Sequence, residues 1–116
     1  MLEIRRHNGG FVISGHAGYA ERGQDIVCAA VSALVQTFIA SIEELTKDHI
    51  TSDIRAGKAV ICYRNLSESA RLLLDSFFVG VRMIAEDYPA NVRIVQGGTM
   101  LNCQDKKQAK VSKIRG

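Results

Sequence analysis

The chain has 116 residues, of which 47% are hydrophobic and 23% are charged. A chain of this length forms one domain, which excludes an enzyme assembled from separate cofactor and substrate domains. With ten glycines and one proline, the composition is that of a globular protein and excludes a mainly disordered chain.

The net charge of +3 is concentrated at the end of the sequence. Residues 102–116 contain five basic and one acidic side chain, whereas residues 1–101 contain 10 basic and 11 acidic ones. We therefore interpret residues 1–101 as a single domain that is not basic, and residues 102–116 as a basic, flexible tail. RNA contact through this tail is conceivable, but nothing else in the sequence supports it.

The cysteines and the N-terminus indicate a compartment. Cys28, Cys62 and Cys103 cannot all pair and have no CxxC spacing, and the first residues lack the apolar stretch of a signal peptide. A reducing cytoplasm is therefore expected. The longest nearly apolar run, residues 26–35, is far shorter than the ~20 residues of a membrane span, so we expect no membrane partner.

The first half of the sequence predicts a hairpin and a long helix. Apolar and polar residues alternate over residues 2–6, and Asn8-Gly9 supplies a tight turn before the β-forming residues 11–14. From Asp25 the apolar residues recur at helical spacing. The predicted buried face of this helix consists of Val27, Val31, Leu34, Val35, Phe38, Ile42 and Leu45.

The second half predicts another hairpin, a helix and a last strand. Strands at residues 50–55 and 59–64 flank a turn, and a helix follows whose cap is Asn65 or Ser67. Pro89 ends this helix near Tyr88. Its predicted buried face consists of Ala70, Leu73, Leu74, Phe77, Val81 and Ile84, with Phe78 on the surface. Residues 92–95 form the last strand before Gly97-Gly98.

The element order is therefore ββαββαβ. Two helices that each have one apolar face are most simply covered by packing on the same side of a sheet. We predict an α+β fold, with a mainly antiparallel five-stranded sheet and both helices on one face.

A glycine-containing loop joins His16 to Cys28, in the first turn of the predicted helix. A thiol attacks as the thiolate, and a free thiol of pKa about 8.5 is only a few per cent ionised at neutral pH. A helix N-terminus favours the anion by up to roughly 2 kcal/mol, little more than one pKa unit, so an imidazole partner is also needed. Gly15, Gly18 and Gly23 would let the chain return His16 toward Cys28.

Several interpretations of these residues remain open. Asp25 could cap the helix or orient His16, and Ser32, one turn after Cys28, could donate a hydrogen bond or simply allow close packing. On composition alone a cysteine among valine and alanine is more often a core residue than a nucleophile. Thiol redox sensing would need a nearby resolving cysteine, for which Cys62 is the candidate. No spacing indicates a metal site or a cofactor.

Residues 15–20 (GHAGYA) and 23–34 (GQDIVCAAVSAL) closely resemble the signature of the ribosomal-processing cysteine protease family Prp, and a looser resemblance extends over residues 1–98. The resemblance implies a cytoplasmic bacterial endopeptidase, an α+β homodimer with a Cys-His dyad and no cofactor. Its implied substrate is the short N-terminal extension of ribosomal large-subunit protein twenty-seven, cut after an apolar stretch that contains Phe.

The resemblance also implies roles for individual residues. Cys28 matches the nucleophile and His16 the general base, and Asp25 and Ser32 match supporting positions. A flexible segment over the substrate cleft would contain Gly18, Tyr19, Gly23 and Gln24. Backbone N–H groups at the helix start are expected to stabilise the oxyanion. The alternative is a non-enzymatic ribosome-associated binding module in which Cys28 is only packed.

Overall fold

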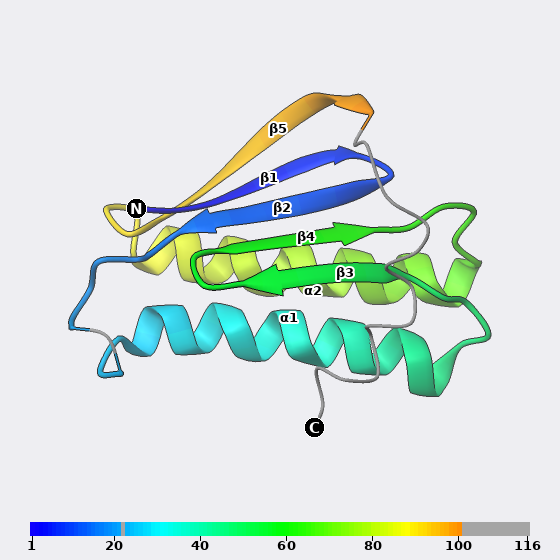
Figure 1. The fold of residues 1–116 in the computed structure, drawn as a ribbon, viewed down its shortest axis with the longest axis horizontal. Helices are drawn as coiled ribbons and strands as arrows, with labels where there is room; N and C mark the ends of the chain where they lie inside the picture. Colours follow the sequence, from blue (N-terminus) through cyan, green and yellow to red (C-terminus); the bar gives the residue numbers. More distant parts are fainter. Residues whose placement is uncertain (22, 101–116) are drawn as a thin grey trace.

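Two long helices pack against one face of a five-stranded sheet in the computed structural model (Figure 1). The structure describes residues 1–21 and 23–100, and the predicted tail, residues 102–116, lies outside them. The elements are β1 (Leu2–Asn8), β2 (Gly10–Gly15), α1 (Ile26–Leu45), β3 (Thr51–Arg55), β4 (Lys58–Cys62), α2 (Glu68–Asp87) and β5 (Val92–Met100). The predicted ββαββαβ order and α+β fold are confirmed.

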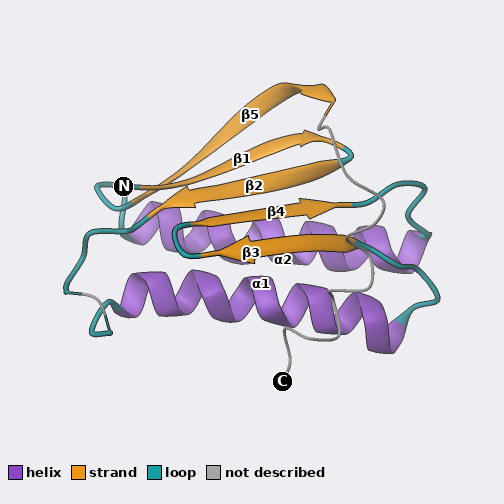
Figure 2. Cartoon of the chain, viewed as in Figure 1, coloured by secondary structure: helices purple, strands orange, loops and turns teal. Residues whose placement is uncertain are grey.

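The strands lie in the order β3-β4-β2-β1-β5 (Figure 2). All neighbouring pairs are antiparallel except β1 and β5, which are parallel because the chain crosses the sheet through α2 before β5. At the β1–β2 turn, Gly9 has a positive φ of 83° but Asn8 does not, so the expected type I′ turn, in which both residues have positive φ, is not the one formed. The prediction ended β5 too early: the strand continues through Gly97 to Met100, after a register shift against β1.

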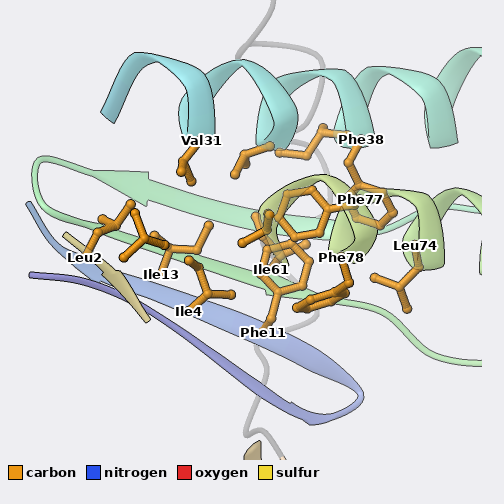
Figure 3. Packing of buried hydrophobic residues seen from close by; sticks show 14 of the residues in the cluster. Leu2, Ile4, Phe11, Ile13, Val31, Phe38, Ile61, Leu74, Phe77 and Phe78 are labelled. Atoms are coloured by element: carbon orange, nitrogen blue, oxygen red, sulfur yellow. The ribbon is translucent and has the colours of Figure 1, made fainter. Parts of the chain in front are cut away.

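Phe11 is the centre of the core between the sheet and the helices (Figure 3). Its ring is fully buried, stacks on Phe77 at 4.8 Å and meets Phe78 edge-on at 5.5 Å. Burying one such ring contributes about 1.5–3 kcal/mol. The expectation that Phe78 is a surface residue is wrong, because its ring is 8% exposed and the guanidinium of Arg6 covers it at 4.2 Å.

The helix faces and caps follow the sequence pattern with some differences. Three residues predicted to be buried are only partly buried, namely Leu34, Leu73 and Ile84. Leu45 is exposed rather than buried because α1 ends there, and Ile39 joins the buried face instead. Of the two predicted caps of α2, Ser67 is the one used: its hydroxyl accepts a hydrogen bond of 3.2 Å from the Ala70 N–H. Asn65 instead has a φ of 53° in the preceding turn.

Helix α1 is long and apolar enough to cross a membrane by length and composition alone. In this structure α1 is a core helix. It is long and apolar because its buried side chains cover the sheet along nearly its whole length. The buried side chains are Val27, Val31, Val35, Phe38, Ile39 and Ile42. Outside this buried face lie Ser32, Gln36 and Thr37, all of them exposed and polar.

Candidate active site

His16 follows directly after β2, at the edge of the turn between β3 and β4. Gly15 has a φ of 88°, and a Cβ there would collide with the carbonyl oxygen of Met1, so only glycine fits. The Gly15 N–H donates a 2.9 Å hydrogen bond to the carbonyl of Gly57. This bond fixes the start of the loop, and the His16 imidazole lies over Gly57.

Cys28 is the third residue of α1, and its half-buried thiol is free. Its Sγ accepts a hydrogen bond of 3.2 Å from the backbone N–H of Ala17, in the loop that precedes the helix. The loop therefore does return to the sulfur, as the glycine pattern suggested. A backbone N–H directed at sulfur favours a negative charge there.

Two cavities meet at these residues, because His16, Cys28 and Ser32 line both of them. The first, of about 250 Å³, lies between α1 and the sheet and is mainly apolar. Its walls include Leu2, Ile13, Val31, Val35, Ile54 and Ala59. The second, of about 370 Å³, lies between α1 and the loop and is lined by small residues, among them Gly18 and Gly23. The structure thus brings His16, Cys28 and Ser32 together around one opening.

Asp25 caps α1 and also fastens the loop. Its Oδ1 accepts hydrogen bonds of 3.0 Å from the N–H groups of Val27 and Cys28. Its Oδ2 accepts one of 3.0 Å from Tyr19 and one of 3.5 Å from Ala20. These bonds, above all that from Cys28, lower the pKa of the Asp25 carboxyl below its ordinary value. The sequence left two roles open for Asp25, and in the structure it is the N-cap of α1.

The cap overturns one expectation about the oxyanion. The N–H groups of Val27 and Cys28 already donate to Asp25, and that of Ala29 donates to the Asp25 carbonyl. These donors at the helix start are therefore occupied and are not available to an oxyanion.

The first half of the loop is held by several contacts. Ala17 is 2% exposed and packs into the core, and the ring of Tyr19 meets that of Tyr88 edge-on at 5.4 Å. Further along, the Gln24 N–H donates to the carbonyl of Glu21. Gly18 and Gly23 line the second cavity, whereas Tyr19 and Gln24 line neither.

The model of the cysteine protease Prp family matches residues 2–93, most of the chain. This chain belongs to the Prp family of cysteine proteases. The loop from His16 to Cys28 lies wholly inside the matched region, so the predicted family and enzyme class are confirmed.

Individual Prp proteins show the same relationship. The ribosomal processing cysteine protease Prp of Bacillus subtilis is 30% identical over 100 residues, covering 78% of this chain and 89% of its own. A crystal structure of Prp from Staphylococcus aureus with a covalently linked product peptide has a TM-score of 0.79 and 26% identity, covering 83% of this chain and 99% of that one. A second Staphylococcus aureus structure, with a substrate peptide, has a TM-score of 0.74, 25% identity and the same coverage.

Two residues of this Prp site were not found from the sequence, Asn91 and Gly57. The side-chain amide of Asn91 donates a 2.9 Å hydrogen bond to the carbonyl of Ala17, and Gly57 lies under His16. Both belong to turns, where asparagine and glycine are common for reasons unrelated to a site. No local pattern connects either residue to the loop.

Cys62 is poorly placed as a resolving cysteine. It lies at the end of β4, four residues from Lys58, which lines the first cavity beside Cys28. Cys62 is disulfide-bonded whereas the Cys28 thiol is free, so the two cysteines are not paired with each other in this structure. Among residues 1–21 and 23–100, no three His, Cys, Asp or Glu side chains form a candidate metal site.

Proposed function

We propose that this protein removes the short N-terminal extension of bacterial ribosomal large-subunit protein twenty-seven, using Cys28 as nucleophile and His16 as general base. The observation that carries the proposal is the convergence of His16 and Cys28 on one opening, with an apolar cavity beside it. The resemblance of residues 15–34 to the family signature supports the assignment of both residues. The peptides held by the Staphylococcus aureus Prp structures support a peptide substrate.

The chemistry proceeds through an acyl-enzyme. His16 accepts the thiol proton of Cys28, and the sulfur forms a bond to the scissile carbonyl carbon. As the tetrahedral intermediate collapses, the C–N bond breaks and protonated His16 gives its proton to the leaving amine. Water, deprotonated by His16, then attacks the thioester, and the carboxylate product and the thiol are released.

The apolar cavity supports a preference for an apolar side chain next to the cleaved bond. Leu2 and Ile13 from the sheet face Val31 and Val35 from α1 across this cavity, immediately beside Cys28. A phenylalanine of the substrate would exchange water for these side chains, which favours binding. The second cavity, lined by small residues, leaves room for the substrate backbone on the other side of Cys28.

The cellular setting forms part of the same proposal. We infer a homodimer from the family resemblance, and a cytoplasmic location from the cysteine spacing and the lack of a signal-peptide stretch in the sequence. Sedimentation at micromolar concentration tests the dimer, and a monomer would contradict it. RNA contact through residues 102–116 has no support from the described residues and is not part of the proposal.

A peptide that copies the Phe-containing extension and the first residues of the mature ribosomal protein tests the function directly. Mass spectrometry should show a single cut after the apolar stretch, and Cys28→Ser should abolish it. Thr37→Ser is the matched control, because it changes an exposed side chain further along the same helix. Cleavage at the normal rate by Cys28→Ser would overturn the assignment of the nucleophile.

A second measurement separates the protease from the binding module. Iodoacetamide should alkylate Cys28 rapidly at neutral pH, and more slowly after His16→Gln. An inert Cys28 in a protein that cleaves no extension peptide would favour the non-enzymatic module instead.

A further inference from the structure

The backbone of Ala17 connects Cys28 to Asn91, a residue that lies 74 positions after Ala17 in the chain. The Ala17 N–H donates to Cys28 Sγ at 3.2 Å, and the Ala17 carbonyl accepts from Asn91 Nδ2 at 2.9 Å. Ala17 as a whole residue is 2% exposed and belongs to the core cluster. The orientation of the N–H at the sulfur is therefore determined by a hydrogen bond on one side and by packing on the other.

Asn91 is itself held firmly in the turn between α2 and β5. Its backbone N–H donates to the carbonyl of Tyr88 at 2.9 Å, and its carbonyl accepts from the N–H of Leu2 at 2.8 Å. The next residue, Val92, is 2% exposed and begins β5. A side chain on such a fixed backbone can orient the loop without large changes of its own position.

The remaining donors near the sulfur make this contact important. The N–H groups of Val27 and Cys28 donate to Asp25. Among the residues that the structure describes, the Ala17 N–H is the group that donates to Cys28 Sγ. A backbone donor aimed at a sulfur stabilises the thiolate, whereas burial favours the neutral thiol.

We propose that Asn91 is a positioning residue, which holds the Ala17 N–H against the Cys28 sulfur and so stabilises the thiolate. The proposal rests on the proposed role of Cys28 as the nucleophile. During attack the negative charge moves from sulfur to the adjacent carbonyl oxygen, for which the same N–H is then a candidate donor. The Ala17 N–H would thus be a hydrogen-bond donor in place of the Val27 and Cys28 N–H groups, which donate to Asp25.

The test is the pH profile of Cys28 alkylation by iodoacetamide in the full chain, measured together with the melting temperature. In Asn91→Ala the profile should move about one pH unit higher and the rate at pH 7 should fall about tenfold, while the limiting rate at high pH stays unchanged. Asn91→Gln keeps the amide donor and should recover part of the shift. Arg93→Ala is the matched control, because it breaks a bond from β5 to Glu3 and not one to the loop.

A purely structural role predicts a different result. The melting temperature would then fall while the pH profile stayed in place, and that outcome in folded Asn91→Ala would overturn the proposal. If Asn91→Ala does not fold, Asn91→Leu replaces it, because leucine has a similar size to asparagine but no amide donor. The same comparison of pH profile and melting temperature then tests the proposal. Alkylation needs no peptide substrate, so an Asn91-dependent profile in a protein that cleaves nothing would contradict the proposed function and leave this inference standing.

Discussion

The imidazole of His16 lies directly against Gly57, in the turn between β3 and β4. A Cβ added to Gly57 would be 3.2 Å from His16 Nε2 and 3.6 Å from Cε1. The imidazole therefore packs against the backbone of this turn. The hydrogen bond from the Gly15 N–H to the Gly57 carbonyl fixes the position of the turn. The position of His16, the proposed general base, depends on the absence of a side chain at Gly57.

Gly57→Ala should displace the imidazole and reduce kcat/KM about tenfold or more, because small misplacements of a catalytic group are costly. Gly57 also has a φ of 75°, so alanine strains the backbone as well. Gly9→Ala is the control for strain alone, since Gly9 has a φ of 83° in the turn at the other end of the sheet. Equal activities of the two variants would contradict the packing argument.

His16→Gln should lower kcat by roughly 10²–10⁴-fold, the usual contribution of a general acid–base. The comparison is His49→Gln, because His49 is exposed beyond the opposite end of α1 and contacts Glu43. Peptide cleavage measured under saturating substrate separates the two variants. A His16 variant as active as the His49 variant would remove His16 from the mechanism.

Ser32→Ala should reduce kcat by about tenfold with little change in KM, if the hydroxyl donates to the developing oxyanion. Ser32 is exposed on α1 and lines both cavities, one turn after Cys28. Thr37→Ala changes a hydroxyl on the exposed part of the same helix and should have no effect. A rise in KM alone would indicate that Ser32 binds substrate instead.

Asp25→Asn should lower the melting temperature by several degrees at neutral pH, because it weakens a cap that accepts four N–H groups. The pKa of Asp25 is lowered in the folded state, so its stabilisation is present above the ordinary value of 3.8 and is lost as the pH falls through the lowered one. Melting curves from pH 7 to pH 2 should show the difference between the two proteins shrinking in acid. A difference that is constant with pH would exclude the charged cap.

Burial raises the pKa of Tyr63 to about 12, so the folded state keeps its phenol neutral after that of the unfolded chain has begun to ionise. The stabilisation is complete below pH 10 and is lost as the pH rises towards 12. Denaturant unfolding should therefore show a steeper alkaline loss of stability in the natural protein than in Tyr63→Phe. Parallel losses would mean that the phenol is more solvated than its position beside Phe11 indicates.

The elements near Cys28 could be predicted because their signals are local. Helical spacing from Val27 onward defined α1, and the Asn8-Gly9 pair defined the first turn. The errors occurred where tertiary contacts override such signals. Phe78 is buried because Arg6 covers its ring. Strand β5 continues through Gly97 because β1 provides backbone hydrogen-bond partners.

The sequence by itself determined the helices, the hairpins and the residues able to react, because helical periodicity, turn chemistry and the side chains themselves involve only near neighbours. Only the tertiary structure decided how those residues are held. Asp25 is a cap, Gly57 supports His16, and Asn91 reaches Ala17 across 74 positions. These contacts depend on the order of the strands and on the crossing of α2, which bring distant turns together and leave no periodic trace in the chain.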